Sequence, residues 1–319
     1  MTAIIELRDL TKRYGDLTAI DTLNLSIEEG AVFGFIGPNG AGKTTTMRIL
    51  TTLLRPTSGE ARIAGHSVTD KPQSVRRVMG YMPDFFGVYE DMKVWEYLDF
   101  FAACYEVSLA IRPGMIDDLL ALVDLGHKRD AYVETLSRGM KQRLCLARTL
   151  THDPQVLILD EPASGLDPRA RIEMRELLRE LQHMGKTIFF SSHILSEVAD
   201  ICTSIGIIEN GRLVATGNVA EMMSRLRAHR SVAMRVVPGA AIDVDEAAIW
   251  LRSEPQVLSV IVDSNEPSPV LRLDFGGDDL ELSGLLARAI GRGLPVLSFH
   301  EEHGDLEDVF LQVTQGTAD

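Results

Sequence analysis

The stretch GPNGAGKTT, residues 37–45, constrains the fold of this chain more than any other. It matches the pattern G-x-x-x-x-G-K-[ST] and lies between a strand-like apolar run, AVFGFI, and a helical run, TTMRILTTLL. Glycines there let backbone N–H groups close around phosphate oxygens, with Lys43 reaching the β- and γ-phosphates and Thr44 ligating Mg²⁺. A glycine-rich turn that matches by chance would not explain the strand and the helix on either side. The predicted phosphate cradle consists of Gly37, Pro38, Asn39, Gly40, Ala41, Gly42, Lys43, Thr44 and Thr45.

A second apolar run, VLILDEP, predicts a central strand that is buried on both faces. Asp160 and Glu161 follow it directly, at the carboxyl edge where ligands bind in doubly wound sheets. Since neighbouring side chains on a strand point to opposite sides, one carboxylate can enter the Mg²⁺ shell while the other faces an attacking water. In isolation the pair would equally suit a solvated strand end. Beside the phosphate cradle, it favours a hydrolytic site.

Short β-rich runs (AVFGFIG, QVLILDEP, KTIFFSS and SIGIIENG) alternate with helical patterns along the chain. This alternation predicts a parallel sheet of βα units and an α/β fold. Strand signals vanish between Tyr81 and Pro154, where helical runs such as VWEYLDFFAACYEV dominate. A helical insertion is therefore expected at about residues 85–152.

The tail of the chain has its own composition and its own pattern. From residue 230 onward it holds sixteen acidic residues against six arginines and no lysine, so it carries most of the net charge of −14. Its runs follow the order strand, helix, strand, strand, helix, strand, which is the order of a ferredoxin-like α+β unit. We therefore expect two domains, residues 1–228 and an accessory domain at 229–319.

Composition narrows the possible partners and the compartment. An excess of negative charge disfavours nucleic acid, because binding the phosphate backbone needs clustered Lys and Arg. The three cysteines are widely spaced, which fits a reducing compartment and neither a disulfide framework nor a zinc site. No run approaches the roughly 18 apolar residues of a membrane span. The expected location is the cytoplasm, and any role at a membrane would be exerted through a partner protein.

The stretch ETLSRGMKQRLCLA, residues 134–147, predicts the start of a helix, with Ser137 as the short polar residue ahead of it. Such a start leaves backbone N–H groups unpaired and carries positive partial charge, so it suits an anion. The residues alone do not say which anion, because a better phosphate site lies earlier in the chain.

The motifs GPNGAGKTT, LSRGMKQR, VLILDEP, ASGLD and SSH, in this order and spacing, resemble the nucleotide-binding subunit of ATP-binding-cassette (ABC) transporters. The resemblance covers roughly the first domain and implies a P-loop ATPase fold that binds ATP and Mg²⁺. It implies that Tyr14 stacks on adenine and that Asp160 serves the metal. It further assigns Glu161 as the general base, His193 as a γ-phosphate contact, and Asp167 to a loop that links two active sites.

The resemblance also implies partners. Ser137 and Gly139 would meet the γ-phosphate held by another chain, so that a homodimer or heterodimer sandwiches two ATP molecules. A separate integral membrane permease would anchor the chain peripherally at the inner face of the cell membrane. The terminal GDLEDVFLQVT resembles the extension of exporter-type ATPases, which favours export over import. The alternative, a soluble cassette ATPase that remodels a ribosome or nucleic acid, usually has two cassettes or a long coiled-coil insertion, and a small-molecule kinase would have no signature motif.

Two departures from the family pattern matter. Where the family has Gln after the strand that enters the insertion, YMPDFF offers Asp84, which could act in catalysis and bind Mg²⁺ but cannot donate a hydrogen bond to water as an amide can. The alternative is that Asp84 caps the next turn. The usual L-S-G-G-Q reads L-S-R-G-M here, so Arg138 could add charge to the anion site or point away, as Met140 could.

Two weaker features remain open. The aromatic run FFGVY, residues 85–89, predicts either a groove for a membrane subunit's helix or plain packing inside the insertion. His300 and His303 lie near two acids, but their spacing is not that of H-E-x-x-H, so a solvated strand end is favoured over zinc.

Overall fold

The structure is a computed structural model, and it describes residues 3–85, 87, 89, 91–193, 198, 201–219, 230–237, 244–263 and 268–302. The chain forms two compact units, Met1–Val219 and Ala220–Asp319, and each is considered by itself. The domain boundary expected after residue 228 falls outside the described residues. None of the helices in the described ranges combines the length and the apolar character that crossing a membrane requires.

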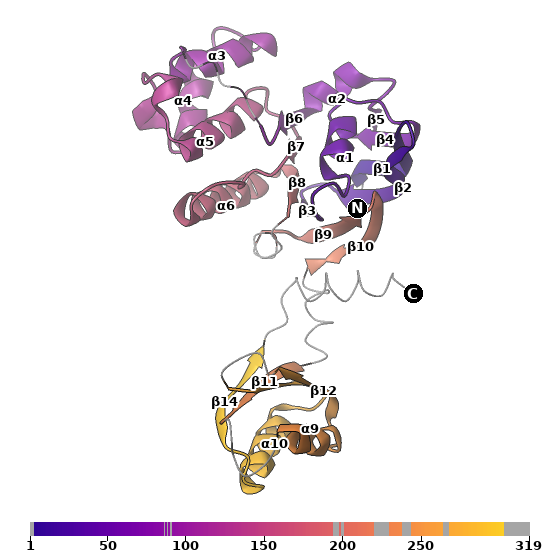
Figure 1. Cartoon of the computed structure of the whole chain (residues 1–319). Helices are drawn as coiled ribbons and strands as arrows, with labels where there is room; N and C mark the ends of the chain where they lie inside the picture. The colour runs from indigo at the N-terminus through magenta and orange to yellow at the C-terminus, as the bar shows by residue number, and fades with distance from the viewer. Residues whose placement is uncertain are drawn as a thin grey trace. The chain divides into compact units, whose positions relative to one another are not determined.

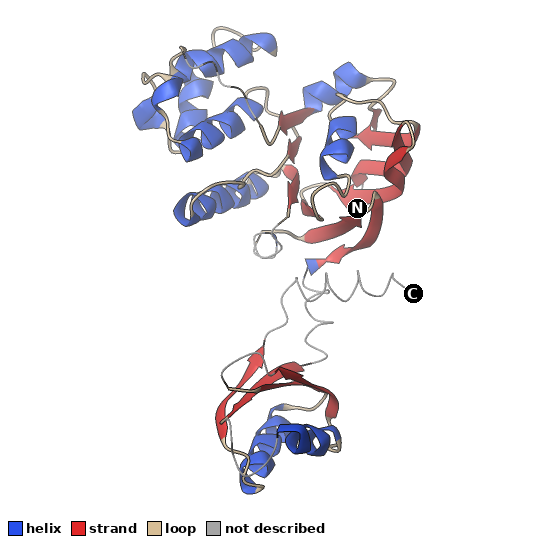
Figure 2. Ribbon diagram, in the orientation of Figure 1, coloured by secondary structure: helices blue, strands red, loops and turns tan. Residues whose placement is uncertain are grey.

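A six-stranded sheet with the order β10-β9-β3-β8-β7-β6 forms the centre of the first unit (Figures 1 and 2). Neighbouring strands run parallel except for the β10–β9 pair. Every residue of β3, β7 and β8 is buried, as expected for strands covered on both faces. The predicted α/β class is confirmed. The strands are β3 (Val32–Ile36), β6 (Met79–Met82), β7 (Val156–Leu159), β8 (Thr187–Ser192), β9 (Ser204–Glu209) and β10 (Arg212–Asn218).

A second, antiparallel sheet with the order β2-β1-β4-β5 belongs to the same unit, and the sequence analysis did not anticipate it. Its buried side chains join those of β3, β7 and β8 and of helix α1 in one apolar core. This core fixes α1 beside both sheets, which places the loop before α1 at the edge of the parallel sheet (Figure 1). The elements are β1 (Ala3–Tyr14), β2 (Leu17–Glu28), β4 (Ser58–Ile63), β5 (His66–Ser67), α1 (Lys43–Leu50) and α2 (Pro72–Val78).

Three helices that pack on one another, α3 (Val94–Cys104), α4 (Arg112–Leu122) and α5 (Arg138–Thr149), occupy the segment between β6 and β7. Two 3₁₀ turns, Gly126–Lys128 and Val133–Thr135, connect α4 to α5. Helix α6 (Pro168–His183) follows β7. The Asp167 side chain accepts hydrogen bonds from the N–H groups of Arg169 and Ala170 and so caps α6, whose first residue is a proline.

The second unit contains an antiparallel sheet with the order β12-β13-β11-β14. Alternate residues of the strands and the apolar sides of the two helices form its core. Asp278 and Glu281 make a reciprocal capping box that begins α10. The elements are β11 (Arg230–Val236), α9 (Val244–Arg252), β12 (Val257–Asp263), β13 (Val270–Phe275), α10 (Asp279–Gly291) and β14 (Val296–Glu302). His300 lies exposed on β14, whereas His303 and the segment GDLEDVFLQVT lie outside the described residues.

Candidate functional site

The loop between β3 and α1 contains the predicted phosphate cradle. Gly42 has φ +111°, and a Cβ atom placed on it would lie 2.7 Å from the carbonyl oxygen of Ala19, so a side chain is excluded both by the backbone conformation and by the neighbouring chain. Helix α1 begins at Lys43, immediately after this glycine, so its unpaired N–H groups open onto the loop. The local geometry is that of an anion-binding helix start.

The side chain of Lys43 is folded back against its own loop and is only 7% exposed. Its Nζ donates to the carbonyl oxygens of Gly37 at 2.6 Å and Pro38 at 3.3 Å, and it lies 3.8 Å from Oε1 of Glu161. Burial lowers the pKa of Lys43, while Glu161 and Asp160 act in the opposite direction. A cation confined among carbonyl and carboxylate oxygens can exchange these partners for phosphate oxygens.

Asp160 is buried at the end of β7, and its Oδ1 accepts hydrogen bonds from two hydroxyl groups. Ser191 of β8 donates from Oγ at 2.7 Å, and Thr44 of α1 donates from Oγ1 at 3.4 Å. The convergence of a carboxylate and a hydroxyl gives hard oxygen ligands of the kind that Mg²⁺ takes together with substrate phosphates. The residues present therefore fit a magnesium ion.

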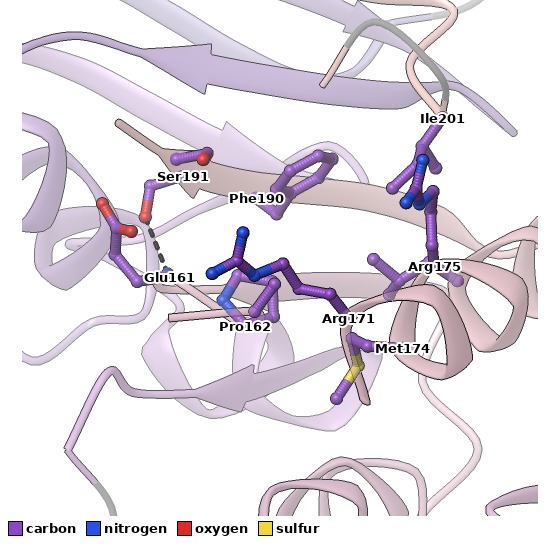
Figure 3. Close-up of a pocket in the computed structure, with 11 residues that line it drawn as sticks. Glu161, Pro162, Arg171, Met174, Arg175, Phe190, Ser191 and Ile201 are labelled. Atoms are coloured by element: carbon purple, nitrogen blue, oxygen red, sulfur yellow. Dashed lines mark hydrogen bonds between the residues drawn. The ribbon is translucent and has the colours of Figure 1, made fainter. Parts of the chain in front are cut away.

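Glu161 faces His193 across the end of the sheet. Its Oε2 lies 2.8 Å from Nδ1 of His193, and its backbone N–H donates to Oγ of Ser191 at 2.9 Å, the bond drawn as a dashed line in Figure 3. Burial raises the pKa of Glu161, although the hydrogen bond to His193 and the charge of Lys43 act to lower it. A carboxylate with a raised pKa is the stronger base. Glu161 also has φ +51°, a conformation in which a non-glycine residue is strained.

One hollow of about 350 Å³ unites most of the predicted residues. Asp84 is exposed at its edge and makes no hydrogen bond to another of the described residues. Tyr14, at the end of β1, does not line this hollow; it is 46% exposed, with Nζ of Lys12 5.0 Å from its ring centroid. The hollow is lined by Ala19, Pro38, Asn39, Gly40, Gly42, Lys43, Thr44, Thr45, Asp84, Glu161, Ser164 and His193.

Glu161 also lines a second, smaller cavity (Figure 3). Arg171 and Arg175 extend into it from α6, and Phe190 of β8 forms another wall. Its volume of about 30 Å³ suits a few water molecules and excludes a nucleotide. Of these two cavities, the hollow over the phosphate cradle is the candidate ligand site.

The expected helix start at Ser137 is present. The Ser137 Oγ accepts a hydrogen bond from the N–H of Met140 at 3.3 Å and caps α5, which leaves its own hydrogen free to donate outward. Ser137 and Gly139 do not line the hollow that contains Lys43. The Arg138 guanidinium turns toward its own chain, where Nη2 lies 3.4 Å from the carbonyl oxygen of Ser164.

Sequence reasoning missed three residues that shape this site. Ser191 bonds both Asp160 and Glu161, Ser164 lines the hollow, and Gln142 donates from Nε2 to the carbonyl oxygen of Pro162. Ser191 lies inside the recognised SSH stretch, and its position one residue before the strand's end could have identified it. The contacts of Ser164 and Gln142 depend on the path of the loop after Glu161, for which the sequence offers no signal.

A phosphate-binding loop between β3 and α1, together with two acids at the end of β7, the next parallel strand but one in the same sheet, defines a P-loop nucleoside triphosphatase. The family model described as "ABC transporter" matches residues 20–164. The Nod factor export ATP-binding protein I of Ralstonia nicotianae is 33% identical over 98% of this chain and 94% of that protein. The daunorubicin/doxorubicin resistance ATP-binding protein DrrA of Streptomyces peucetius is 35% identical over 100% of this chain and 94% of that protein.

A solved structure described as an ATP-binding subunit of an ABC transporter is 30% identical, with a TM-score of 0.64. The alignment covers 70% of this chain and 93% of that one. The chain belongs to the ABC transporter family, in which it is an ATP-binding and ATP-hydrolysing subunit. Because both relatives match along nearly their whole length and are named as export or resistance ATP-binding proteins, the ribosome or nucleic-acid alternative is not favoured.

Proposed function

We propose that this subunit powers export through a separate integral membrane permease, from the cytoplasmic face of the membrane. The observation that carries this proposal is the match to two export-type proteins over 98% and 100% of the chain, which includes the acidic second unit as well as the ATPase core. A likeness confined to the core would say nothing about direction, since the core serves importers and exporters alike.

In the proposed mechanism, Lys43 and the amides before it hold the β- and γ-phosphates of ATP. When ATP binds, the buried Nζ of Lys43 moves from the carbonyl oxygens of Gly37 and Pro38 to phosphate oxygens. A magnesium ion bound by Thr44 and Asp160 would neutralise phosphate charge. Ser191 orients the Asp160 carboxylate through its 2.7 Å hydrogen bond, so Asp160 keeps one fixed direction toward the hollow.

Glu161 acts as the general base that takes a proton from the attacking water. Its raised pKa and its position in the hollow support this role. His193 orients the Glu161 carboxyl through Nδ1 and contacts the γ-phosphate once the nucleotide is bound. Asp84, exposed on the same hollow, would be a further carboxylate ligand for the magnesium ion.

The site of one chain is completed by another chain. Ser137 caps α5 with its oxygen while its hydroxyl hydrogen is available, and it lies outside the hollow of its own chain. This arrangement supports a head-to-tail dimer in which Ser137 and Gly139 meet the partner's γ-phosphate, with Tyr14 stacked on adenine and two ATP molecules enclosed. Both a homodimer and a heterodimer satisfy this geometry.

The second unit is proposed to be a ferredoxin-like accessory domain. Its strand order, β12-β13-β11-β14, with the element order strand, helix, strand, strand, helix, strand, supports this assignment. The residues that line the nucleotide hollow belong to the first unit. We therefore propose a regulatory role, outside nucleotide chemistry, for the second unit.

The permease is proposed to dock on the aromatic cluster of the helical segment. Tyr89 lies edge-on to Phe100 with ring centroids 5.4 Å apart, and Phe101 contacts both rings. Next to Asp84, Phe85 is 89% exposed. Large apolar side chains that remain exposed beside a packed aromatic cluster are typical of a surface that binds an apolar partner.

Affinity capture from detergent-solubilised membranes tests this function. Tagged full-length chain carrying Glu161→Gln is expected to retain an integral membrane protein, identified by mass spectrometry. Phe100→Ser should weaken this capture, whereas Leu109→Ser is the matched control, because Leu109 is also exposed (76%) but lies outside the aromatic cluster. Capture of ribosomal proteins in place of a membrane protein would overturn the proposal.

A further inference from the structure

Helix α5 contacts the loop that follows Glu161, and the start of α6 beyond that loop, at three points in the same chain. Gln142, buried in α5, donates to the carbonyl oxygen of Pro162. Gly139 approaches α6 so closely that a Cβ placed on it would lie 3.3 Å from Cβ of Ala170. The third point is Arg138, the first residue of α5 and the neighbour of the capping Ser137.

The Arg138 guanidinium lies against Gly165 of this loop. A Cβ on Gly165 would fall 2.5 Å from Cζ and 2.9 Å from Nη1 of Arg138, and Gly165 has φ +66°, so no other residue fits there without displacing the arginine. Nη2 also donates to the carbonyl oxygen of Ser164 at 3.4 Å. The guanidinium thus occupies the space beside Gly165 and also donates to the preceding residue.

The loop connects this contact directly to the proposed base. The N–H of Ser164 donates to the carbonyl oxygen of Glu161 at 3.1 Å, and Ser164 lines the nucleotide hollow. Glu161 itself is held in the left-handed region, at φ +51°. Strain of this kind persists only where the surroundings hold the backbone in place. From α5, Arg138 and Gln142 donate to two carbonyl groups of the loop that follows Glu161, and Ser191 holds the N–H of Glu161 from β8.

We propose that Arg138 is a positioning residue for Glu161 of its own chain. By fixing Ser164 and Gly165 to the start of α5, it makes the location of the base depend on the location of that helix. If α5 docks on the partner's ATP, a step that rests on the proposed function, this docking fixes the position of Glu161 in the chain that supplies α5. The closing of one nucleotide site then positions the base of the other site. The sequence alternative, in which Arg138 reaches the partner's phosphate, is the competing assignment.

The test compares the steady-state ATPase activity of full-length chains carrying Arg138→Gln, Arg138→Lys and Arg169→Gln. Arg138→Gln should lower kcat between about tenfold and a hundredfold and leave KM for ATP unchanged, because displacement of a catalytic group by about 1 Å has costs of that order. Arg138→Lys should recover part of kcat, since its ammonium can still donate to Ser164. Arg169→Gln removes the same charge from an exposed residue that pairs with Glu173, and it should behave as wild type.

Hydrogen exchange on the nucleotide-free chain supplies a readout that does not depend on dimer formation. The N–H of Ser164 should exchange several-fold faster in Arg138→Gln, while the amides of α1 stay unchanged. A raised KM with normal kcat would assign Arg138 to the partner's phosphate and overturn the proposal while leaving the composite site intact. Unchanged exchange at Ser164, or faster exchange with normal kcat, would also overturn it. Failure of the wild-type chain to form an ATP dimer would contradict only the proposed function.

Discussion

Oε2 of Glu161 and Nδ1 of His193 lie 2.8 Å apart at the end of the parallel sheet. An ionised Glu161 can only accept this bond, so a neutral His193 places its hydrogen on Nδ1 and leaves Nε2 without one. A contact from Nε2 to a phosphate oxygen then requires a second proton on the ring, and a contact from Nδ1 requires release of Glu161. If His193 makes the proposed phosphate contact, nucleotide binding and the hydrogen bonding of Glu161 would be coupled through one imidazole.

Glu161→Gln should lower ATP turnover by orders of magnitude while ATP still binds. The amide keeps the shape of the side chain but cannot accept the proton from water, and the cradle around Lys43 is untouched. Single-turnover hydrolysis and equilibrium ATP binding measure the two effects separately. Turnover at the wild-type rate would remove Glu161 from the mechanism and make Asp84 the next candidate.

Asp84→Gln should retain ATPase activity and change its dependence on the divalent ion. A carboxylate near Mg²⁺ binds the metal directly or through water, whereas an amide is a weaker, neutral ligand. Activity is measured across Mg²⁺ and Mn²⁺ concentrations for both chains. An identical metal profile would favour a structural role in the turn that follows.

How far the site was predictable depends on how local each contact is. The phosphate cradle and the acids Asp160 and Glu161 follow single strands, so short motifs predicted that they would meet at one sheet edge. In the antiparallel sheet, Asp9 and Thr22 have positive φ, and the β1–β2 register shifts between Leu7 and Lys12, which breaks the alternation that would have revealed the strands.

The direction of Arg138 was unpredictable for a different reason. Its position depends on the left-handed conformation of Gly165, a residue on a loop that is distant in the sequence. From the sequence motif, the Arg138 side chain could either reach the anion site or point away from it. Only the packing of that loop distinguishes these two directions.

A half-buried imidazole away from the active site should make the first unit sensitive to acid. His152 stacks on Tyr105 with ring centroids 3.7 Å apart, and its Nε2 donates to the carbonyl oxygen of Met79 at 3.1 Å. Nδ1 is then the unprotonated nitrogen, and it is buried with no hydrogen-bond partner within the described part of the chain. Burial lowers the pKa of His152 below its usual 6.5.

The direction of the pH dependence of stability follows from this lowered pKa. As pH falls below 6.5, the unfolded chain takes up a proton that the folded chain excludes, so stability is lost. The midpoint temperature of thermal unfolding of the wild-type chain should therefore fall as the pH is lowered from about 8 to about 5. The fall should be smaller in His152→Phe, because phenylalanine keeps the stacked ring and cannot titrate. Equal drops in both chains would assign the acid sensitivity to other groups.

The second unit should be dispensable for nucleotide binding. A chain that ends near residue 228 retains every residue of the hollow, and its first unit has a core of its own. Circular dichroism establishes folding, and ATP affinity within about twofold of the full chain is expected. A folded truncated chain that cannot bind ATP would contradict the division of roles.

The most direct test of the account measures ATP trapped in mixed dimers, with Glu161→Gln in every chain to prevent turnover. Lys43→Ala and Ser137→Asp chains should each fail to trap ATP alone. Aspartate still caps α5, so its effect reports repulsion of phosphate and not loss of the cap, which would cost about 1 kcal/mol. Mixing should restore one complete site, built from the P-loop of the Ser137→Asp chain and the Ser137 of the Lys43→Ala chain. The account predicts trapped ATP only in the mixture, after rapid gel filtration. Absence of trapped ATP in a mixture shown to contain mixed dimers, or trapping by either chain alone, would contradict it.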